Sequence, residues 1–320
     1  TLYDTVHLSL ETSGISLQDL LNKLDWYNEP SQGFHTGNLS VKGSIQNNSA
    51  GKLQIKFSDT FPQKLTVSGS LAKFHYGNNL EELTRAETQK AIEQISERLS
   101  VDMRQAKVYR LDIGANFIMD RPCNEYQSLL NESPRMTRST LSAKSNSLYF
   151  KNGRKTIILY DKVADCQRLK EPIPEVFAGQ HVLRYELRYM QNLPSQFKRQ
   201  TVTAQTLYSE LFYIETLNKW KESYFAISRN EGYRMKEDIE IKKPQELLKH
   251  FAAIGIQQFG TGQVLDMLET SRQSGKLSKM QAHRLKHAVK VITSTPELVE
   301  PNDSIKELDR KVTRAVACYR

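Results

Sequence analysis

The sequence has few cysteines, no long apolar run and no internal repeat. Its 320 residues include three cysteines, Cys123, Cys166 and Cys318, and no C-x-x-C. An odd, scattered set predicts neither a disulfide framework nor a zinc site. No stretch approaches the roughly 20 apolar residues of a membrane span, and the N-terminus lacks the basic-then-apolar pattern of a signal peptide. We therefore expect an intracellular protein with no membrane contact.

Positive charge exceeds negative charge. The 45 Lys and Arg against 36 Asp and Glu give a net charge of +9, which favours a polyanionic partner such as nucleic acid. Arg135, Arg138 and Lys144 lie in a Ser/Thr-rich stretch, residues 133–147, that has too little apolar content for a core element. Such a loop suits backbone phosphates. A solvated surface loop explains the same residues, so both interpretations stay open.

Apolar periodicity predicts strands, then helices, along the chain. Strands are predicted over residues 3–10, 38–45, 52–57, 64–70, 108–117, 147–150, 156–162 and 182–189. Helices are predicted over residues 16–26, from Thr84 onward, and over 204–225, 244–259, 263–271, 278–293 and 305–319. Thr84 and Glu87 have the spacing of a capping box. The pattern predicts an α+β fold.

The predicted secondary structure changes from mixed to helical near Glu240, and we therefore expect two domains that meet there. Residues 1–240 carry the strands, whereas residues 241–320 are predicted to be all helical. The second domain has a basic segment, residues 276–290, which is either a DNA-contacting helix or a solvated helix face. Its expected role is DNA binding, dimerisation or partner contact.

Three of the predicted strands carry ionisable side chains on one face, because residues two apart in a strand point the same way. The polar set is Arg110 and Asp112 on the first, Tyr160 and Lys162 on the second, and Arg184, Glu186 and Arg188 on the third. The alternate residues are apolar and face a core. If the strands are neighbours, the polar face has the inventory of a metal-dependent site that acts on phosphate through a tyrosine nucleophile.

The motifs of these strands, in this order, resemble those of a known family. They are Arg110-Leu111-Asp112, Tyr160-Asp161-Lys162 and Arg184-Tyr185-Glu186-Leu187-Arg188, accompanied by Tyr3-Asp4-Thr5-Val6, Gly69-Ser70-Leu71-Ala72-Lys73 and Asn78-Asn79. Together they resemble the gene II/gene X family of phage and plasmid replication initiators, which start rolling-circle replication in filamentous phages. The resemblance spans about residues 1–225.

The resemblance implies a central, mostly antiparallel sheet with helices on its apolar face and DNA on its polar face. It implies an endonuclease that nicks one strand of single-stranded or supercoiled origin DNA. Tyr160 would attack a phosphodiester, form a 5′-phosphotyrosyl intermediate and free a 3′-hydroxyl primer, with later rejoining. It also implies the cytoplasm of a bacterial cell, with the gene on a phage, a plasmid or an integrated element.

The chemistry of Tyr160 agrees with such a role. A phenol with a pKa of about 10 is a poor nucleophile at neutral pH and needs a nearby cation or base. Lys162 lies on the same face if the strand continues that far. Ordinary packing of a strand tyrosine is the alternative. Tyr149 is a candidate second nucleophile, and reuse of Tyr160 or a second subunit are the other routes to termination.

Asp112 and Glu186 are the candidate metal ligands, because each is embedded in apolar strand sequence where an unpaired charge is costly. The competing interpretation pairs them with arginines on neighbouring strands. Asp165 matches an acidic position of the family, and Asp161 is another nearby candidate. The seven histidines include no H-x-H, so we expect an all-oxygen site for Mg²⁺ or Mn²⁺. His75 is a further candidate ligand, and His181 should face away from Glu186.

The expected DNA contacts combine the motif residues with the basic loop. They are Lys73, Arg110, Arg135, Arg138, Lys144, Arg184 and Arg188. A host helicase and a dimer on DNA are candidate partners. Two other classes of protein fit part of the pattern: a non-catalytic origin-binding protein or replication repressor on the same scaffold, and a glycoside hydrolase that uses Asp112 and Glu186. The basic charge and the arginines oppose the hydrolase.

Overall fold

The computed structural model forms two compact units. It describes residues 3–12, 15–16, 19–20, 22, 25–26, 31–32, 39–46, 51–59, 62–141, 147–229, 233–235, 241–259, 261–293, 299–301 and 303–318. The first unit is Thr1–Ser228 with Leu308–Arg320, and the second is Arg229–Glu307. This division differs from the expected one at residue 240, because the end of the chain returns to the first unit.

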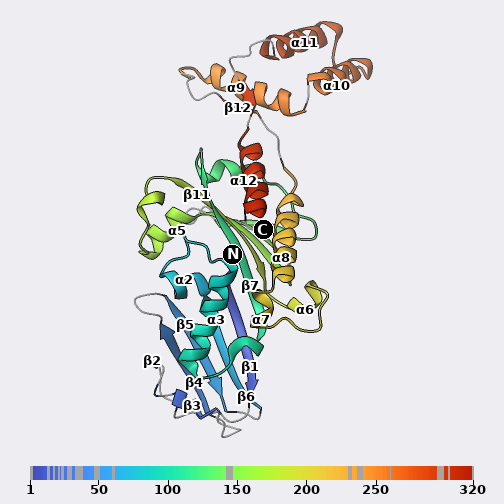
Figure 1. Cartoon of the computed structure of the whole chain (residues 1–320). Coiled ribbons are helices and arrows are strands. Elements are labelled where there is room, and N and C mark those ends of the chain that lie inside the picture. The colour runs from blue at the N-terminus through green and yellow to red at the C-terminus, as the bar shows by residue number, and fades with distance from the viewer. Residues whose placement is uncertain are drawn as a thin grey trace. The chain divides into compact units, whose positions relative to one another are not determined.

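A single large sheet organises the first unit (Figure 1). Its strand order is β2-β4-β5-β6-β1-β7-β11-β10-β9-β8, with β3 beside β4. The strands are β1 (Tyr3–Thr12), β2 (Asp25–Trp26), β3 (Ser31–Gln32), β4 (Leu39–Gln46), β5 (Lys52–Ser58), β6 (Gln63–Ser70), β7 (Lys107–Met119), β8 (Thr137–Leu141), β9 (Ser147–Lys151), β10 (Lys155–Asp161) and β11 (His181–Tyr189). The pairs within it are antiparallel. The predicted α+β class and antiparallel sheet are confirmed.

The helices of the first unit follow the strands at intervals along the chain. They are α2 (Leu71–Tyr76), α3 (Arg85–Leu99), η1 (Met103–Gln105), α4 (Cys123–Ser128), α5 (Lys162–Leu169), η2 (Glu175–Phe177), α6 (Leu193–Gln196), α7 (Ala204–Leu207) and α8 (Glu210–Phe225). Helix α3 begins with the predicted capping box: the Glu87 amide donates to Thr84 Oγ1 at 3.2 Å, and the Thr84 amide donates to Glu87 Oε2 at 2.6 Å. Each side chain thus satisfies an amide that the helix leaves unpaired.

Helix α8 covers the apolar face of the sheet with aromatic side chains. The Trp220 ring lies 4.7 Å from that of Tyr185 on β11 and 6.3 Å from that of Phe117 on β7, measured between centroids. Tyr224 adds a further contact to Tyr185, at 5.5 Å. These rings are buried, and aromatic burial of this kind is a large part of a core's stability.

The predicted helix over residues 204–225 is in fact two helices, α7 and α8. The backbone of Ser209 is extended, with φ −69° and ψ 132°, so the helical hydrogen bonds stop there and start again. The restart changes which side chains face the sheet. Leu211, although apolar, is 78% exposed.

Three further predictions of local structure were wrong in part. The predicted helix over residues 16–26 ends in the short strand β2, and residues 17, 18, 21, 23 and 24 lie outside the described residues. The predicted loop over residues 133–147 contains β8 as an edge strand paired with β9. Lys162 does not continue strand β10 but opens helix α5, because the Asp161 side chain accepts from the Ala164 amide at 2.9 Å and caps the helix.

The second unit contains α9 (Pro244–Phe259), α10 (Thr261–Gln273) and α11 (Lys279–Thr293), as predicted. It also contains a two-stranded antiparallel sheet of β12 (Tyr233–Met235) and β13 (Val299–Pro301), which the periodicity missed because both strands are so short. Helix α12 (Ser304–Cys318) is the last described element, and from Leu308 onward its residues belong to the first unit. Among the described residues, no helix is both long enough and apolar enough to cross a membrane.

Trp220→Ala should destabilise the first unit strongly, because the substitution empties the space between α8 and the sheet. We expect a loss of about 3–5 kcal/mol in the free energy of unfolding, measured by urea denaturation. Leu211→Ala on the same helix is the matched control, and its exposed position predicts a change within about 0.5 kcal/mol. Equal losses in the two variants would show that the helix is packed in another orientation.

Candidate functional site

The three polar-faced strands are neighbours in the sheet, in the order β7-β11-β10. Arg188 on β11 lies opposite Asp112 on β7, and Arg184 lies opposite Tyr160 on β10. Directly paired residues in a sheet share a face. The predicted gathering of arginines, carboxylates and a tyrosine on one face is therefore confirmed.

Arg184 is the centre of this face, and its guanidinium is buried, with 2% of the residue exposed. Its Nε donates to Glu186 Oε1 at 2.5 Å, and its Nη2 donates to Asp4 Oδ2 at 2.7 Å. Its Nη1 donates to the Asn79 carbonyl at 3.2 Å and to Asn116 Oδ1 at 3.0 Å. Burial alone would lower the pKa of Arg184, but the surrounding negative charges raise the pKa well above its ordinary value. The guanidinium thus ties four chain segments together.

Asp4 is a member of the site for which the sequence motifs predicted no role. It lies on β1, is buried, and accepts from Ser70 Oγ and from Asn79 Nδ2 as well as from Arg184. Asp4, Ser70 and Asn79 all belong to the short stretches that accompany the three main motifs. Their place in these motifs was the one sequence feature that could have predicted a role for them in the site. Asn116 had no comparable signal, because it stands in a strand outside every quoted motif.

The segment after α2 lies over the Arg184 end of the polar face. Asn116 Nδ2 donates to the carbonyls of Asn79 and Leu80, at 3.3 and 3.0 Å. The Asn116 amide donates to Glu82 Oε1 at 3.2 Å. Burial raises the pKa of Glu82 to about 6, against the hydrogen bond from Asn116. This end of the face is therefore closed, whereas Arg188 at the other end keeps 31% of its side chain exposed.

Glu186 accepts hydrogen bonds from three side chains. Oε1 accepts from Tyr160 Oη at 2.9 Å and from Arg184 Nε, and Oε2 accepts from Nε and Nη2 of Arg188 at 3.0 and 2.7 Å. A carboxylate offers about four acceptor sites, so these contacts use its capacity. Burial would raise the pKa of Glu186, but the two arginines outweigh burial and lower the pKa to about 2. Glu186 is held as a fixed anion.

Tyr160 lies against this anion and is 9% exposed. Burial raises the pKa of its phenol well above the ordinary value, and the charge of Glu186 raises the pKa further, whereas Arg184 lowers it. The phenol is therefore protonated at neutral pH and donates its hydrogen to Glu186. Here a hydroxyl group donates a hydrogen bond to a carboxylate, and the carboxylate is held in place by arginines. This is the arrangement of a nucleophile and its base.

Asp112 is the second buried carboxylate. Arg110 binds it with two hydrogen bonds, from Nε to Oδ1 at 2.8 Å and from Nη2 to Oδ2 at 2.6 Å. Arg188 Nε lies 3.4 Å from Asp112 Oδ2, so Arg188 bridges Asp112 and Glu186. Burial raises the pKa of Asp112 to about 6, against the lowering effect of Arg110.

Gly114 leaves room for the network. It lies opposite Glu186 in the register of β7 and β11. A Cβ at this position would stand 2.8 Å from Glu186 Cγ and 3.0 Å from Arg184 Nη2. The first distance is shorter than a carbon–carbon contact permits. Only glycine lets the two side chains cross this strand as they do.

Lys162 and Asp165 make their contacts within α5. Lys162 is buried, and its Nζ lies 3.5 Å from Asp165 Oδ2. Asp165 Oδ1 accepts from Arg168 Nη2 at 2.5 Å. The strand geometry that would have placed Lys162 beside the Tyr160 side chain is replaced by the helix start. The proposed roles of Lys162 and Asp165 stay predictions.

The other predicted site residues are spread over the unit. Lys73 on α2 forms an ion pair with Glu171, and Arg138 on β8 donates from Nε to the Leu130 carbonyl at 3.2 Å. Lys144 lies outside the described residues. Tyr149 on β9 lies opposite Ile158 and so shares the polar face, with Lys151 Nζ 4.4 Å from its ring centroid.

The two histidines considered as ligands lie on different elements. His75 is on α2, where its ring contacts that of Tyr76 at 4.7 Å. His181 is exposed at the start of β11.

The carboxylates as arranged do not fit a divalent cation. Asp112 and Glu186 are both engaged by arginines, in the ion pairs that the alternative interpretation expected. Within the described ranges, no group of three or more His, Cys, Asp or Glu side chains stands close enough to hold a metal ion. A cation would have to take carboxylate oxygens from guanidinium groups that already hold them.

Glu186→Gln should weaken the fold in a way that depends on pH. The pKa of Glu186 is lowered from 4.5 to about 2, so the folded state favours the carboxylate by about 3 kcal/mol. Because the folded-state pKa lies below the unfolded one, this stabilisation is present above about pH 4.5 and is lost as the pH falls toward 2.

The measurement is the difference in unfolding free energy between wild type and Glu186→Gln, expected near 3 kcal/mol at pH 7 and about 1 kcal/mol at pH 3. Glu97→Gln, at an exposed position of α3, controls for the loss of one carboxylate and should change stability by less than about 0.5 kcal/mol. A difference that does not change with pH would contradict the lowered pKa.

Gly114→Ala should displace Glu186 and Arg184 and destabilise the first unit by about 1–3 kcal/mol, because the new methyl group overpacks the face. Gly153→Ala, at a position with nothing within 4 Å of a new Cβ, is the matched control. The readout is thermal unfolding of both variants. If the two behave alike, the side chains do not lie over Gly114 as described.

Solved structures and curated proteins add little about this chain. No curated protein matches it. A crystal structure titled "di-domain ARO/CYC StfQ from the steffimycin biosynthetic pathway" is 7% identical, covers 69% of this chain and 94% of its own, and has a TM-score of 0.20. A TM-score that low carries no argument about the fold or the function.

One family model matches most of the first unit. It describes the N-terminal part of a phage replication-associated protein, the gene II protein, and it matches residues 5–222. That range holds all three main motifs, from Arg110 to Arg188. The match covers well over half of the sequence, and the chain therefore belongs to this family of phage replication-associated proteins, the gene II type that its motifs resemble.

Proposed function

We propose that this protein is a replication initiator that nicks one DNA strand at an origin through Tyr160. The observation that carries the proposal is the hydrogen bond from Tyr160 to Glu186, whose carboxylate is fixed by Arg184 and Arg188. Membership of a family of phage replication-associated proteins supports DNA as the substrate. The net charge of +9 agrees with a polyanionic partner.

In the proposed step, Tyr160 Oη attacks the scissile phosphorus and its proton passes to Glu186. The bond between phosphorus and the 3′ oxygen breaks, and that oxygen takes a proton from solvent. The products are a 5′-phosphotyrosyl bond and a free 3′-hydroxyl primer. The reverse reaction, with a new 3′-hydroxyl as the attacking group, rejoins the strand. No group other than these two side chains and water is needed for the balance of atoms and protons.

Arg188 has the geometry to link phosphate binding to base strength. Arg188 donates hydrogen bonds to Glu186, and 31% of the Arg188 side chain is still exposed. A phosphate that draws Arg188 toward itself weakens the two hydrogen bonds that Arg188 donates to Glu186. The pKa of Glu186 then rises from its lowered value, because an opposite charge has moved away. The carboxylate would thus become a stronger base when substrate is present.

The divalent cation, Mg²⁺ or Mn²⁺, stays a prediction of the family resemblance. No step above passes through it, because the carboxylates expected to bind it are held by arginines. The ligands predicted from the sequence are Asp112, Glu186 and Asp165.

The second candidate function is a non-catalytic origin-binding protein or replication repressor on the same scaffold. Two observations favour it: Tyr160 is 9% exposed, and Glu186 is saturated with hydrogen bonds. A face built in this way serves stability as well as chemistry. The two functions differ in whether a covalent bond to DNA forms.

The nucleophile is tested with single-stranded and supercoiled DNA that carries the cognate origin. Wild type is expected to yield a protein–DNA adduct that survives a denaturing gel, and Tyr160→Phe should yield none, because the attacking oxygen is gone. Tyr149→Phe, on the same face of β9, is the matched control and should keep the adduct. Each reaction is run with Mg²⁺, with Mn²⁺ and with a chelator.

An adduct that persists in Tyr160→Phe and disappears in Tyr149→Phe would move the nucleophile to β9. Binding of origin DNA without an adduct under any metal condition would favour the origin-binding protein. Loss of the adduct on chelation would support the predicted cation. The helicase contact, the dimer and the role of the second unit stay predictions.

A further inference from the structure

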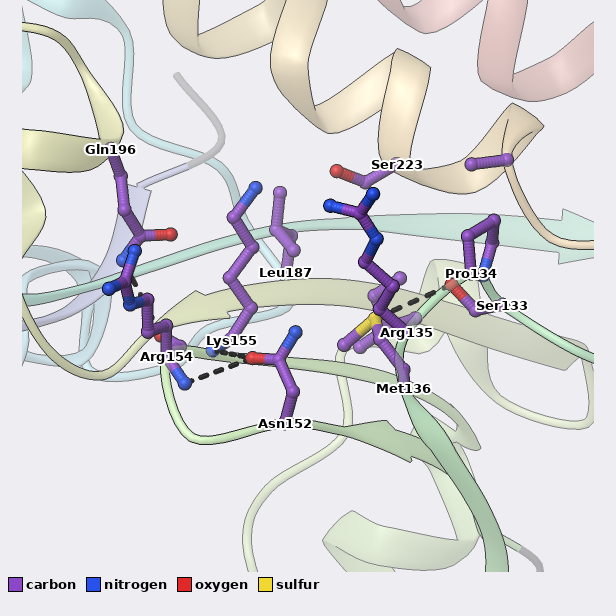
Figure 2. Close-up of a pocket in the computed structure, with 12 residues that line it drawn as sticks. Ser133, Pro134, Arg135, Met136, Asn152, Arg154, Lys155, Leu187, Gln196 and Ser223 are labelled. Carbon is purple, nitrogen blue, oxygen red and sulfur yellow. Dashed lines mark hydrogen bonds between the residues drawn. The ribbon is translucent and has the colours of Figure 1, made fainter.

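A basic hollow lies at one end of the large sheet, between the β9–β10 hairpin, the segment that leads into β8, and α8. Its volume is about 370 Å³. Its polar and charged lining residues include Arg135, Asn152, Arg154, Lys155, Gln196 and Ser223. Figure 2 shows the side chains of Arg135 and Lys155 extending toward Ser223 of α8, with Arg154 near Gln196. We call this region the basic hollow.

The basic hollow is on the face of the sheet opposite to Tyr160. Its floor includes Ile157 and Leu187, which are paired across β10 and β11. Ile157 is next to Ile158 on β10, and Leu187 is next to Glu186 on β11. Because successive side chains of a strand point to opposite faces of the sheet, Ile157 and Leu187 point to the face that α8 covers. The hollow and the tyrosine network are thus two separate sites that share the same strands.

The lining of the basic hollow includes three cationic side chains and no carboxylate. Among the described residues, the guanidinium groups of Arg135 and Arg154 have neither a hydrogen bond nor an ion pair. Most other arginines of this unit that are described above bind carboxylates, as Arg110, Arg184 and Arg188 do. Two unpaired, planar donor groups beside one concave surface suit a phosphate, which accepts from both.

The surroundings of Lys155 disfavour its positive charge. Burial lowers the pKa of its ammonium group, and Lys219 on α8 lowers the pKa further, against a smaller opposite effect of Glu222. Its Nζ also lies 5.1 Å from the ring centroid of Tyr189. An anion in the hollow would offset both the burial and the repulsion.

The backbone around the hollow is fixed in an unusual form. Arg135 has φ 58°, the left-handed region that arginine rarely adopts. The turn is closed by a hydrogen bond from the Met136 amide to the Ser133 carbonyl at 3.2 Å. Glycine would occupy this position with less strain, so the strained backbone at Arg135 points to a use for the arginine side chain.

The hairpin that carries the other two cations is also held in place. Asn152 Oδ1 accepts from the amides of Arg154 and Lys155, at 2.9 and 2.8 Å. A second hollow of about 660 Å³ shares the 133–136 wall and adds Arg138 and Lys151, with Glu132 as its acidic member. The basic surface therefore extends beyond a single anion.

We propose that the basic hollow binds backbone phosphates of a nucleic-acid strand, on the face of the sheet opposite Tyr160. The proposal rests on the proposed function only for the identity of the polyanion. The protein would then hold two stretches of DNA at once, one at the tyrosine and one at the hollow. Arg135 and Arg154 contact the phosphates, and Lys155 contributes charge from the floor.

The test measures equilibrium binding of a labelled single-stranded oligonucleotide by fluorescence anisotropy over a range of salt concentrations. All proteins carry Tyr160→Phe, so that binding is observed without strand cleavage. The added substitutions are Arg135→Gly and Arg154→Ala. Lys90→Ala, at an exposed position of α3 that does not line the hollow, is the matched control for loss of one positive charge.

Each hollow variant should bind roughly tenfold more weakly, the effect of one lost charge-assisted contact. The slope of log affinity against log salt should fall by about 0.7 for each lost phosphate contact. Lys90→Ala should leave the slope unchanged. Arg135→Gly also removes the backbone strain, so its thermal stability should equal or exceed that of the parent protein, and weaker binding by this variant cannot arise from unfolding.

The source of the phosphate is decided by competition with inorganic pyrophosphate and with dATP. Weak competition, together with the loss of oligonucleotide affinity, supports a strand of nucleic acid. If pyrophosphate or dATP binds tightly, and Arg135→Gly abolishes that binding but leaves oligonucleotide affinity unchanged, the hollow serves a free phosphate ligand and the proposal is overturned. Hollow variants that bind the oligonucleotide like Lys90→Ala overturn it as well.

The outcome is independent of the tyrosine assay. If no adduct forms but Arg135→Gly weakens the salt-dependent binding, the phosphate-binding role of the hollow is supported and the nicking activity is contradicted. If the adduct forms but the slopes of log affinity against log salt are unchanged in both hollow variants, the nicking activity is supported and the role of the hollow is contradicted.

Discussion

The buried guanidinium of Arg184 is the interaction on which the polar face depends. Its donors reach Glu186, Asp4, Asn116 and the Asn79 carbonyl, so β11, β1, β7 and the segment after α2 meet at one group. Removing one member of a buried ion pair leaves the remaining charges uncompensated, at a loss of about 3–5 kcal/mol. A face built in this way holds its side chains in fixed positions, which is what the proposed attack by Tyr160 requires of the groups around it.

Much of the fold could be read from the sequence, because alternation and helical spacing report directly which residues face a core. The shared polar faces suggested that these three strands are neighbours, but the order β7-β11-β10 is set by pairings that the pattern does not contain. The helix start at Lys162 was not predicted. Its N-cap is Asp161, which directly follows Tyr160 in a stretch whose pattern predicts a strand. The break at Ser209 is a single backbone rotation, which periodicity does not register.

The site was predicted less completely than the fold, for a physical reason. Strand alternation gives the face of a residue but not its partner, and every carboxylate on this face has arginines within reach. The sequence left metal ligation and ion pairing open for Asp112 and Glu186, and the structure shows the ion pairs. Asp4 and Asn79 were unassigned, because their role depends on contacts between segments far apart in the chain.

The separation of those segments has a consequence for biosynthesis. The Asp4 carboxylate and the Arg184 guanidinium are 180 positions apart in the sequence, and β11 inserts between β7 and β10 after both have been made. A ribosome must therefore release residue 189 before Tyr160 acquires its carboxylate partner. Nascent chains, and fragments that end before β11, carry the tyrosine without the groups that surround it. A growing chain therefore cannot complete the polar face around Tyr160 until translation has passed β11, which is the last strand of the large sheet along the sequence.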